Sequence, residues 1–165
     1  MKIEFNQEWY ANAICEQQLR APYMMTKFVD NEARKAGQIR GLVIEHHVSG
    51  WFKLTYPNHY LEPDNYQHWA EVCSHDFKIK RKSGLLYIDI SGPKRDGTFG
   101  SYNLKPKDGV DFHLLCHALG FKTWQNVDYK KGFQIMGAVR SKNYHTTIKE
   151  EDIIDIQTWL KYICI

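Results

Sequence analysis

The sequence has 165 residues, a net charge of +3, 43% hydrophobic and 14% aromatic residues, which indicates one folded domain and excludes a disordered tail. No apolar run reaches the length of a membrane span, and the first ten residues lack the apolar core of a signal peptide. We therefore expect a soluble, cytoplasmic protein with no membrane contact. In that compartment we expect reduced thiols at the four cysteines, which are Cys15, Cys73, Cys116 and Cys164.

Two helices are predicted in the first third of the chain, over residues 6–19 and from near residue 24 to 49. Gly37 and Gly41 lie one turn apart in the second helix. This spacing lets a neighbouring backbone approach, and packing is the simplest role for both glycines. The aromatic segment 51–56, WFKLTY, then predicts a first strand.

A β-hairpin is predicted next. Residues 75–80, HDFKIK, alternate, with Phe77 and Ile79 on one face and charged side chains on the other. Residues 84–91, GLLYIDIS, alternate in the same way, which is typical of a half-buried strand. The turn between the two strands lies in the RKSG segment.

The rest of the chain predicts a helix, a strand and a last helix. The short helix covers residues 110–119 and ends at Gly120. Residues 132–139, GFQIMGAV, predict a strand that is buried on both faces. Thr147 and Glu150 form a capping-box pattern that opens the last helix. The apolar stripe of that helix is Ile153, Ile156, Leu160 and Ile163.

The predicted order is therefore helix, three strands, helix and strand, with one further helix at each end. This order describes a single α/β domain, residues 1–165, with a core over about 31–139 and helical additions at 1–30 and 146–165. The polar loop 57–72, which precedes the hairpin, is long for such a connection and rich in aromatics. It could grip a nucleic acid or form a partner surface, and packing against the core is an equal alternative.

The hairpin register places two aspartates together. Matching the apolar faces of both strands pairs residues whose numbers sum to 165, so Asp76 lies opposite Asp89. Opposed like charges destabilise a sheet unless a cation lies between them, and paired carboxylates suit Mg²⁺. The alternative is a solvated face on which Lys78 and Lys80 neutralise both aspartates. A three-residue loop, or a bulge, would break this register.

These residues resemble the PD-(D/E)xK nuclease superfamily, whose restriction-endonuclease-like fold has the core order α-β-β-β-α-β. The superfamily places an aspartate on the second core strand, here Asp76. On the next strand it places an acidic residue and, two positions later, a lysine, here Asp89 and Ser91. Many members add a glutamate on the first core helix, here Glu45.

The resemblance implies a Mg²⁺-dependent endonuclease, with Mn²⁺ as an alternative metal, that hydrolyses phosphodiester bonds of DNA rather than RNA. Glu45, Asp76 and Asp89 would hold the metal, which activates a water. Ser91 departs from the pattern because it replaces the catalytic lysine. Lys94, just past the Gly-Pro break, would then bring its amine to the site and complete the catalytic set.

Three alternatives stay open. Without a lysine, the chain would be a catalytically inactive member of the fold that binds nucleic acid or a protein partner. It could also be an unrelated small α/β interaction module whose hairpin only carries charge. A zinc site is the third alternative, although the spacing does not match the usual structural zinc patterns. Its ligands would come from Cys73, His75, His113, Cys116 and His117.

A basic band surrounds the candidate site. The span from residue 78 to residue 107 holds eight basic and two acidic residues, a bias that suits a phosphate backbone or an ordinary solvated surface. The residues expected to contact nucleic acid are Lys78, Lys80, Arg81, Lys82, Lys105 and Lys107. Many members of the superfamily dimerise, so a homodimer is also considered, although no heptad or symmetric patch is evident.

Overall fold

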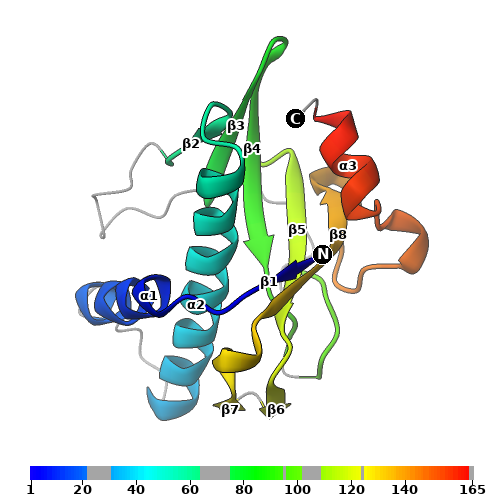
Figure 1. Ribbon diagram of the computed structural model, residues 1–165. Helices are drawn as coiled ribbons and strands as arrows, with labels where there is room; N and C mark the ends of the chain where they lie inside the picture. Colours follow the sequence, from blue (N-terminus) through cyan, green and yellow to red (C-terminus); the bar gives the residue numbers. More distant parts are fainter. Residues whose placement is uncertain (22–30, 64–74, 95, 102–108, 124, 164–165) are drawn as a thin grey trace.

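The computed structural model describes residues 1–21, 31–63, 75–94, 96–101, 109–123 and 125–163. These residues form an α/β fold with a mixed six-stranded sheet of order β1-β8-β5-β4-β3-β2 (Figure 1). The strands are β1 (Lys2–Ile3), β2 (Tyr60–Leu61), β3 (Phe77–Arg81), β4 (Gly84–Ser91), β5 (Phe112–Ala118) and β8 (Phe133–Arg140). The helices are α1 (Gln7–Arg20), α2 (Asn31–Thr55) and α3 (Ile156–Tyr162). A second sheet pairs β6 (Phe121–Thr123) with β7 (Asn126–Val127).

The β3–β4 hairpin has the predicted register. Phe77 pairs with Ile88, and the ladder continues up to Arg81 opposite Gly84. The turn between the strands has two residues, and Gly84 follows it with a φ of 126°, a value that glycine tolerates best. The register pairs the alternating apolar side chains of the two strands, Phe77 with Ile88 and Ile79 with Leu86, as the period-two sequence pattern predicts.

The prediction of a strand over residues 51–56 is wrong, because residues 51–55 form the end of helix α2. The apolar stripe of the helix continues through them, since Ile44, Val48 and Phe52 are spaced by four residues and all are buried. Aromatic residues favour strands only weakly, so burial of this stripe decides the local structure. The short strand β2 takes the place of the missing strand and pairs antiparallel with β3.

The helix predicted over 110–119 is also wrong, because residues 112–118 form strand β5. This strand pairs parallel with β4 and antiparallel with β8. Six of its seven residues are buried, with His117 partly exposed. A strand covered on both faces is apolar throughout, and a short run of that kind cannot be distinguished from a buried helix by periodicity.

The C-terminal helix begins later than the capping-box pattern predicted. Asp155 caps α3, and its Oδ1 accepts hydrogen bonds from the amides of Gln157 at 2.9 Å and Thr158 at 3.0 Å. Residues 150–152 form a short 3₁₀ turn instead. Three members of the predicted apolar stripe are buried in or next to α3, namely Ile156, Leu160 and Ile163. The final strand, predicted over 132–139, is confirmed as β8, but it is not buried on both faces throughout, because Met136 is exposed and Gln134 is half-buried.

The two faces of the sheet are covered differently. Helices α2 and α3 pack on one face (Figure 1). The large side chains buried there include Phe52, Phe77, Phe112, Phe133 and Trp159. On the other face lies a smaller cluster of Leu115, Val139 and Tyr144, packed by Phe99, Ile148 and Ile153. Alternation along β4 directs Ile88 and Ile90 to the helical face and Asp89 to the other.

Helix α1 lies across α2 (Figure 1), and the close contact is at Gly50. A β-carbon at Gly50 would lie 2.4 Å from the Trp9 ring. The expected close approach at Gly37 and Gly41 is not found among the described residues. A β-carbon at Gly37 meets no described atom within 4 Å, and one at Gly41 meets only Glu45 Oε1 at 3.7 Å.

Candidate functional site

Asp76 lies beside Asp89, although not directly opposite it. The amide of Asp76 donates to the carbonyl of Ile88 at 2.8 Å, and Ile88 is already paired with Phe77. Two residues thus face Ile88, as in a β-bulge. Asp76 Oδ2 accepts the amide of Ile90 at 2.6 Å. The carboxylate of Asp76 is therefore held on the peptide group that follows Asp89.

Asp89 is buried and held by two neighbours. Its Oδ2 accepts from His113 Nδ1 at 2.9 Å and from Ser91 Oγ at 3.2 Å. His113 is the register partner of Asp89 on β5, and its ring stacks on Tyr144 with 3.6 Å between centroids. These contacts fix the orientation of the carboxylate on the face of the sheet opposite α2 and α3.

The His113 contacts do not form a serine-hydrolase relay. Ser91 Oγ lies 3.4 Å from His113 Nδ1, the same ring nitrogen that faces Asp89. In such a relay the serine and the carboxylate occupy opposite ring nitrogens. His113 Nε2 is buried and has no hydrogen-bond partner among the described residues. Sequence reasoning missed the pairing of His113 with Asp89, because it assigned residues 110–119 to a helix.

Glu45, half-buried on α2, is electrostatically coupled to Asp89. Burial raises the pKa of Glu45 from 4.5 to about 7. The nearby Arg20 opposes this rise, while the negative charges of Glu16 and Asp89 add to it. Carboxylates that share a site resist simultaneous ionisation, and a cation between them would reverse the effect. The structure thus brings Glu45 and Asp89 into one acidic environment.

A cluster of charged side chains joins α1 to this environment. Glu16 is buried, and its carboxylate forms ion pairs with Arg20 and with His46, the latter at 2.7 Å. His46 directly follows Glu45 in α2, so the cluster adjoins Glu45 along the chain. Sequence reasoning did not find this cluster, because it depends on how α1 packs against α2.

The structure places Lys94 at another contact. Lys94 Nζ donates to the carbonyl of Thr146, in the segment between β8 and α3. Its backbone closes a tight turn, with the Lys94 amide donating to Thr98 at 2.8 Å. The Gly-Pro break before it is anchored by α2, since Arg40 Nη2 donates to the Pro93 carbonyl at 3.0 Å.

Of the residues expected to contact nucleic acid, the described ones lie on β3 and its turn. Lys78 is buried, with Tyr87 and Leu61 as its register partners on the two flanking strands. Lys80 and Lys82 are exposed, and Arg81 is half-buried. The remaining two predicted contacts, Lys105 and Lys107, fall outside the described residues.

The zinc alternative has little geometric support. Cys116 is buried in the core cluster on the helical face, where burial raises the pKa of its thiol far above the usual range. His113 points to the other face, toward Tyr144. In the described ranges, no three His, Cys, Asp or Glu side chains converge closely enough to hold a metal ion, and this applies equally to the predicted set of Glu45, Asp76 and Asp89. Cys73 lies outside those ranges, and Cys15 and Cys116 carry free thiols.

None of the helices in the described ranges combines the length and the apolar character needed to cross a membrane. Comparison of the chain with protein-family models, with curated proteins and with solved structures finds no match.

Proposed function

We propose that this protein is a metal-dependent nuclease that hydrolyses phosphodiester bonds of DNA, with a restriction-endonuclease-like core. The observation that carries the proposal is the gathering of acidic groups around the peptide between Asp89 and Ile90. Asp76 accepts a hydrogen bond from the amide of that peptide, and burial, with smaller contributions from the charges of Glu16 and Asp89, raises the pKa of Glu45 to about 7. Acidic residues with perturbed pKa values are typical of functional sites.

The order of elements supports the same proposal. Helix α2 is followed by β2, β3 and β4 in antiparallel succession, and then by β5, which lies parallel to β4. The order of a helix and three antiparallel strands matches the first part of the expected core. A further strand, β5, follows after a long connection. The connection, residues 92–111, includes residues outside the described ranges, and its described part contains no helix.

The donor set suits a hard divalent cation. Mg²⁺ needs only one or two protein carboxylates, because waters and substrate phosphates complete its coordination. Asp76 and Asp89 would hold the metal, and His113 and Ser91 keep the Asp89 carboxylate in one orientation. A bound Mg²⁺ or Mn²⁺ would supply Lewis acidity and lower the pKa of a water. Glu45 has a pKa near neutrality, so it can accept a proton from that water.

A second candidate function is binding of nucleic acid without hydrolysis. It is favoured by the contacts of the two residues that would replace the catalytic lysine. Ser91 donates its hydroxyl to Asp89, and Lys94 donates its ammonium group to Thr146. Both polar groups thus bind protein atoms, whereas the lysine of the superfamily pattern would stabilise charge on the scissile phosphate.

The two candidates are separated by cleavage assays that also measure binding. Purified protein is incubated with supercoiled plasmid, linear duplex, single-stranded DNA and RNA, with Mg²⁺, Mn²⁺ or EDTA. Metal-dependent cleavage that Asp76→Asn and Asp89→Asn abolish supports the nuclease. Binding of the same substrates without cleavage supports the second candidate.

Lys94→Ala tests the departure from the family pattern. Because the Lys94 ammonium group contacts Thr146, we expect this variant to keep the cleavage rate of the wild type. A large loss of cleavage, with an unchanged melting temperature, would return Lys94 to the mechanism. Lys149→Ala is the matched control, since Lys149 is exposed and its ion pair with Glu151 is 3.6 Å long.

A further inference from the structure

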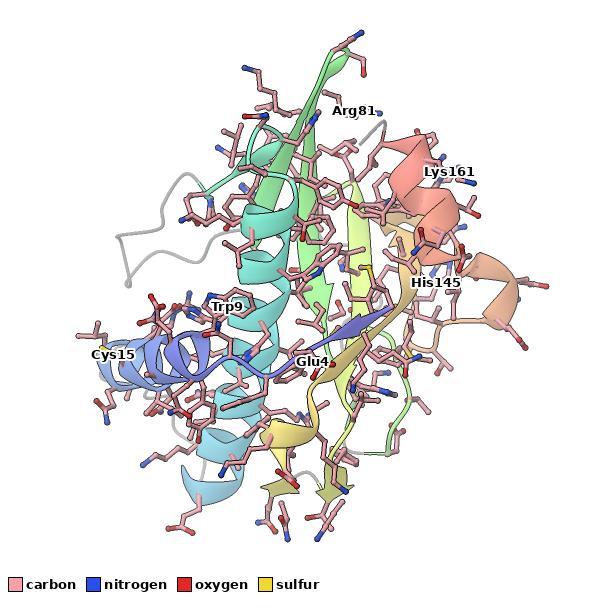
Figure 2. The ribbon with its side chains drawn as sticks, viewed as in Figure 1. Glu4, Trp9, Cys15, Arg81, His145 and Lys161 are labelled. Atoms are coloured by element: carbon pink, nitrogen blue, oxygen red, sulfur yellow. The ribbon has the colours of Figure 1, made fainter. Side chains whose placement is uncertain are left out.

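Two arginines and a tyrosine meet on the helical face of the sheet, at the end where β3 and β8 finish. Arg81 ends β3, Arg140 ends β8 and Tyr162 ends α3. Figure 2 shows Arg81 at this end of the sheet, near the α3 turn that carries Lys161. Arg81 shares a sheet face with Phe77, the helical face, whereas Asp89 lies on the opposite face. The cluster is thus separate from the candidate active site.

Stacking orients the Arg140 guanidinium group. Its Cζ lies 5.3 Å from the centroid of the Phe112 ring and 5.2 Å from that of the Tyr162 ring. Cation–π contacts of this kind use the flat face of the guanidinium group, whereas its N–H donors point outward in the plane. Arg140 is half-buried and Tyr162 is 46% exposed, so solvent reaches the cluster.

Arg81 brings a second positive charge to the hydroxyl group of Tyr162, in addition to that of Arg140. The pKa of Tyr162 is lowered mainly by the hydrogen bond and the charge of Arg140. The charge and hydrogen bond of Arg81 lower it further. Arg81 Nε is buried and has no hydrogen-bond partner among the described residues. A buried donor without a partner is costly.

No described carboxylate neutralises this pair of arginines. The ion pairs of the described residues include neither Arg81 nor Arg140. Asp111, which precedes β5 at this end, uses its Oδ2 to accept the Tyr87 amide at 2.9 Å. Two guanidinium groups that converge without an acidic partner repel each other, and an anion between them would offset that repulsion.

We propose that Arg81, Arg140 and Tyr162 form a phosphate-binding site. Guanidinium groups match the oxygens of a phosphate with paired, charge-assisted hydrogen bonds, and the Tyr162 hydroxyl adds a further polar contact. The phosphate would belong to a nucleic-acid backbone or be free in solution. Exposed Lys80 and Lys82 at the adjacent hairpin turn favour the backbone of a polymer, since they extend the positive surface.

The test measures binding, not hydrolysis, so it is independent of the proposed nuclease activity. Fluorescence anisotropy with a labelled oligonucleotide in EDTA compares the wild type with Arg81→Gln, Arg140→Gln and Tyr162→Phe. We expect each arginine variant to bind about tenfold more weakly. The double variant should lower the salt slope of log K by about 1.8, as expected for two lost phosphate contacts. Lys149→Ala is the control for a general loss of positive charge.

A second arm uses inorganic phosphate, followed by the NMR signals of the arginine side chains. Saturable shifts in the wild type that are absent from Arg81→Gln support the site. If phosphate binds but the oligonucleotide does not, the site takes free phosphate. If Arg140→Gln does not fold because its stacking on Phe112 is lost, the comparison of Arg81→Gln with the wild type alone tests the proposal. Equal binding by Arg81→Gln and the wild type in both arms would overturn the proposal.

Discussion

Replacing Glu45 by glutamine should stabilise the protein at neutral and alkaline pH. Glutamine keeps the shape of the side chain and removes only its negative charge. In the folded chain, burial and the charges of Glu16 and Asp89 outweigh Arg20 and raise the pKa of Glu45 from 4.5 to about 7. Ionised Glu45 therefore opposes folding, although it is the residue that we expect to accept a proton.

The size of the effect follows from the shift in pKa. A rise from 4.5 to about 7 corresponds to about 3 kcal/mol of unfolding free energy once the group is ionised in both states. Between these pH values the folded state holds a proton that the unfolded state has lost, so wild-type stability falls as pH rises from about 4.5 to 7. Because neighbouring carboxylates share the effect, about 3 kcal/mol is an upper limit for one substitution.

The assay is urea unfolding at pH 4 and pH 8 without divalent ions, followed by tryptophan fluorescence. We expect Glu45→Gln to exceed the wild type by about 1–3 kcal/mol at pH 8 and by almost nothing at pH 4. The matched control is Glu4→Gln, because Glu4 is exposed and its ion pair with Lys2 contributes little. A Glu45→Gln protein that is no more stable than the wild type at pH 8, or equally stabilised at both values, would refute the reasoning.

Two further outcomes follow from packing and hydrogen bonding. Gly50→Ala should destabilise the protein by about 1–3 kcal/mol in urea unfolding, because its β-carbon would overlap the Trp9 ring. Gly37→Ala should stabilise it by about 0.5–1 kcal/mol, because the added β-carbon meets no described atom and alanine favours a helix. If both variants behave alike, the α1–α2 contact is misplaced. His113→Ala should destabilise by about 2 kcal/mol, because buried Asp89 loses the shorter of the two side-chain hydrogen bonds that its Oδ2 accepts. Adding Asp89→Asn should remove most of that loss, and additive losses would speak against the pairing.

The hairpin could be predicted because its information is local. Alternation in both strands and a short turn determine the register, which the structure reproduces from Phe77 and Ile88 to Arg81 and Gly84. The end of the ladder could not be predicted. There Asp76 satisfies the amide of Ile90 with its side chain, a choice that depends on three-dimensional geometry.

The two misassigned segments have one physical cause. Phe52 lies in a run of strand-forming residues, yet its burial against Phe77 and Trp159 extends α2. In β5, the apolar run is continuous because both faces of the strand are covered, so the sequence shows no alternation. Both outcomes depend on contacts between segments that are distant in the chain, which local patterns do not contain.

The candidate site shows the same division. The register brought Asp76 close to Asp89, although not directly opposite it as predicted, and Glu45 was chosen through the family resemblance. His113 could not be found, because its contact with Asp89 requires β5 to be a strand parallel to β4. Arg140 was likewise missed, since it meets Tyr162 only when the ends of β8 and α3 come together.

The most direct test of the proposed function is single-turnover cleavage of an end-labelled DNA duplex by the wild type and by Asp89→Asn. Asp96→Asn, purified in parallel, is the control, because Asp96 is an exposed aspartate whose carboxylate binds Thr98 in a surface turn. We expect cleavage by the wild type and Asp96→Asn in Mg²⁺ or Mn²⁺, none in EDTA, and none by Asp89→Asn. Equal cleavage by Asp89→Asn, or no cleavage by the wild type with either metal, would contradict the account.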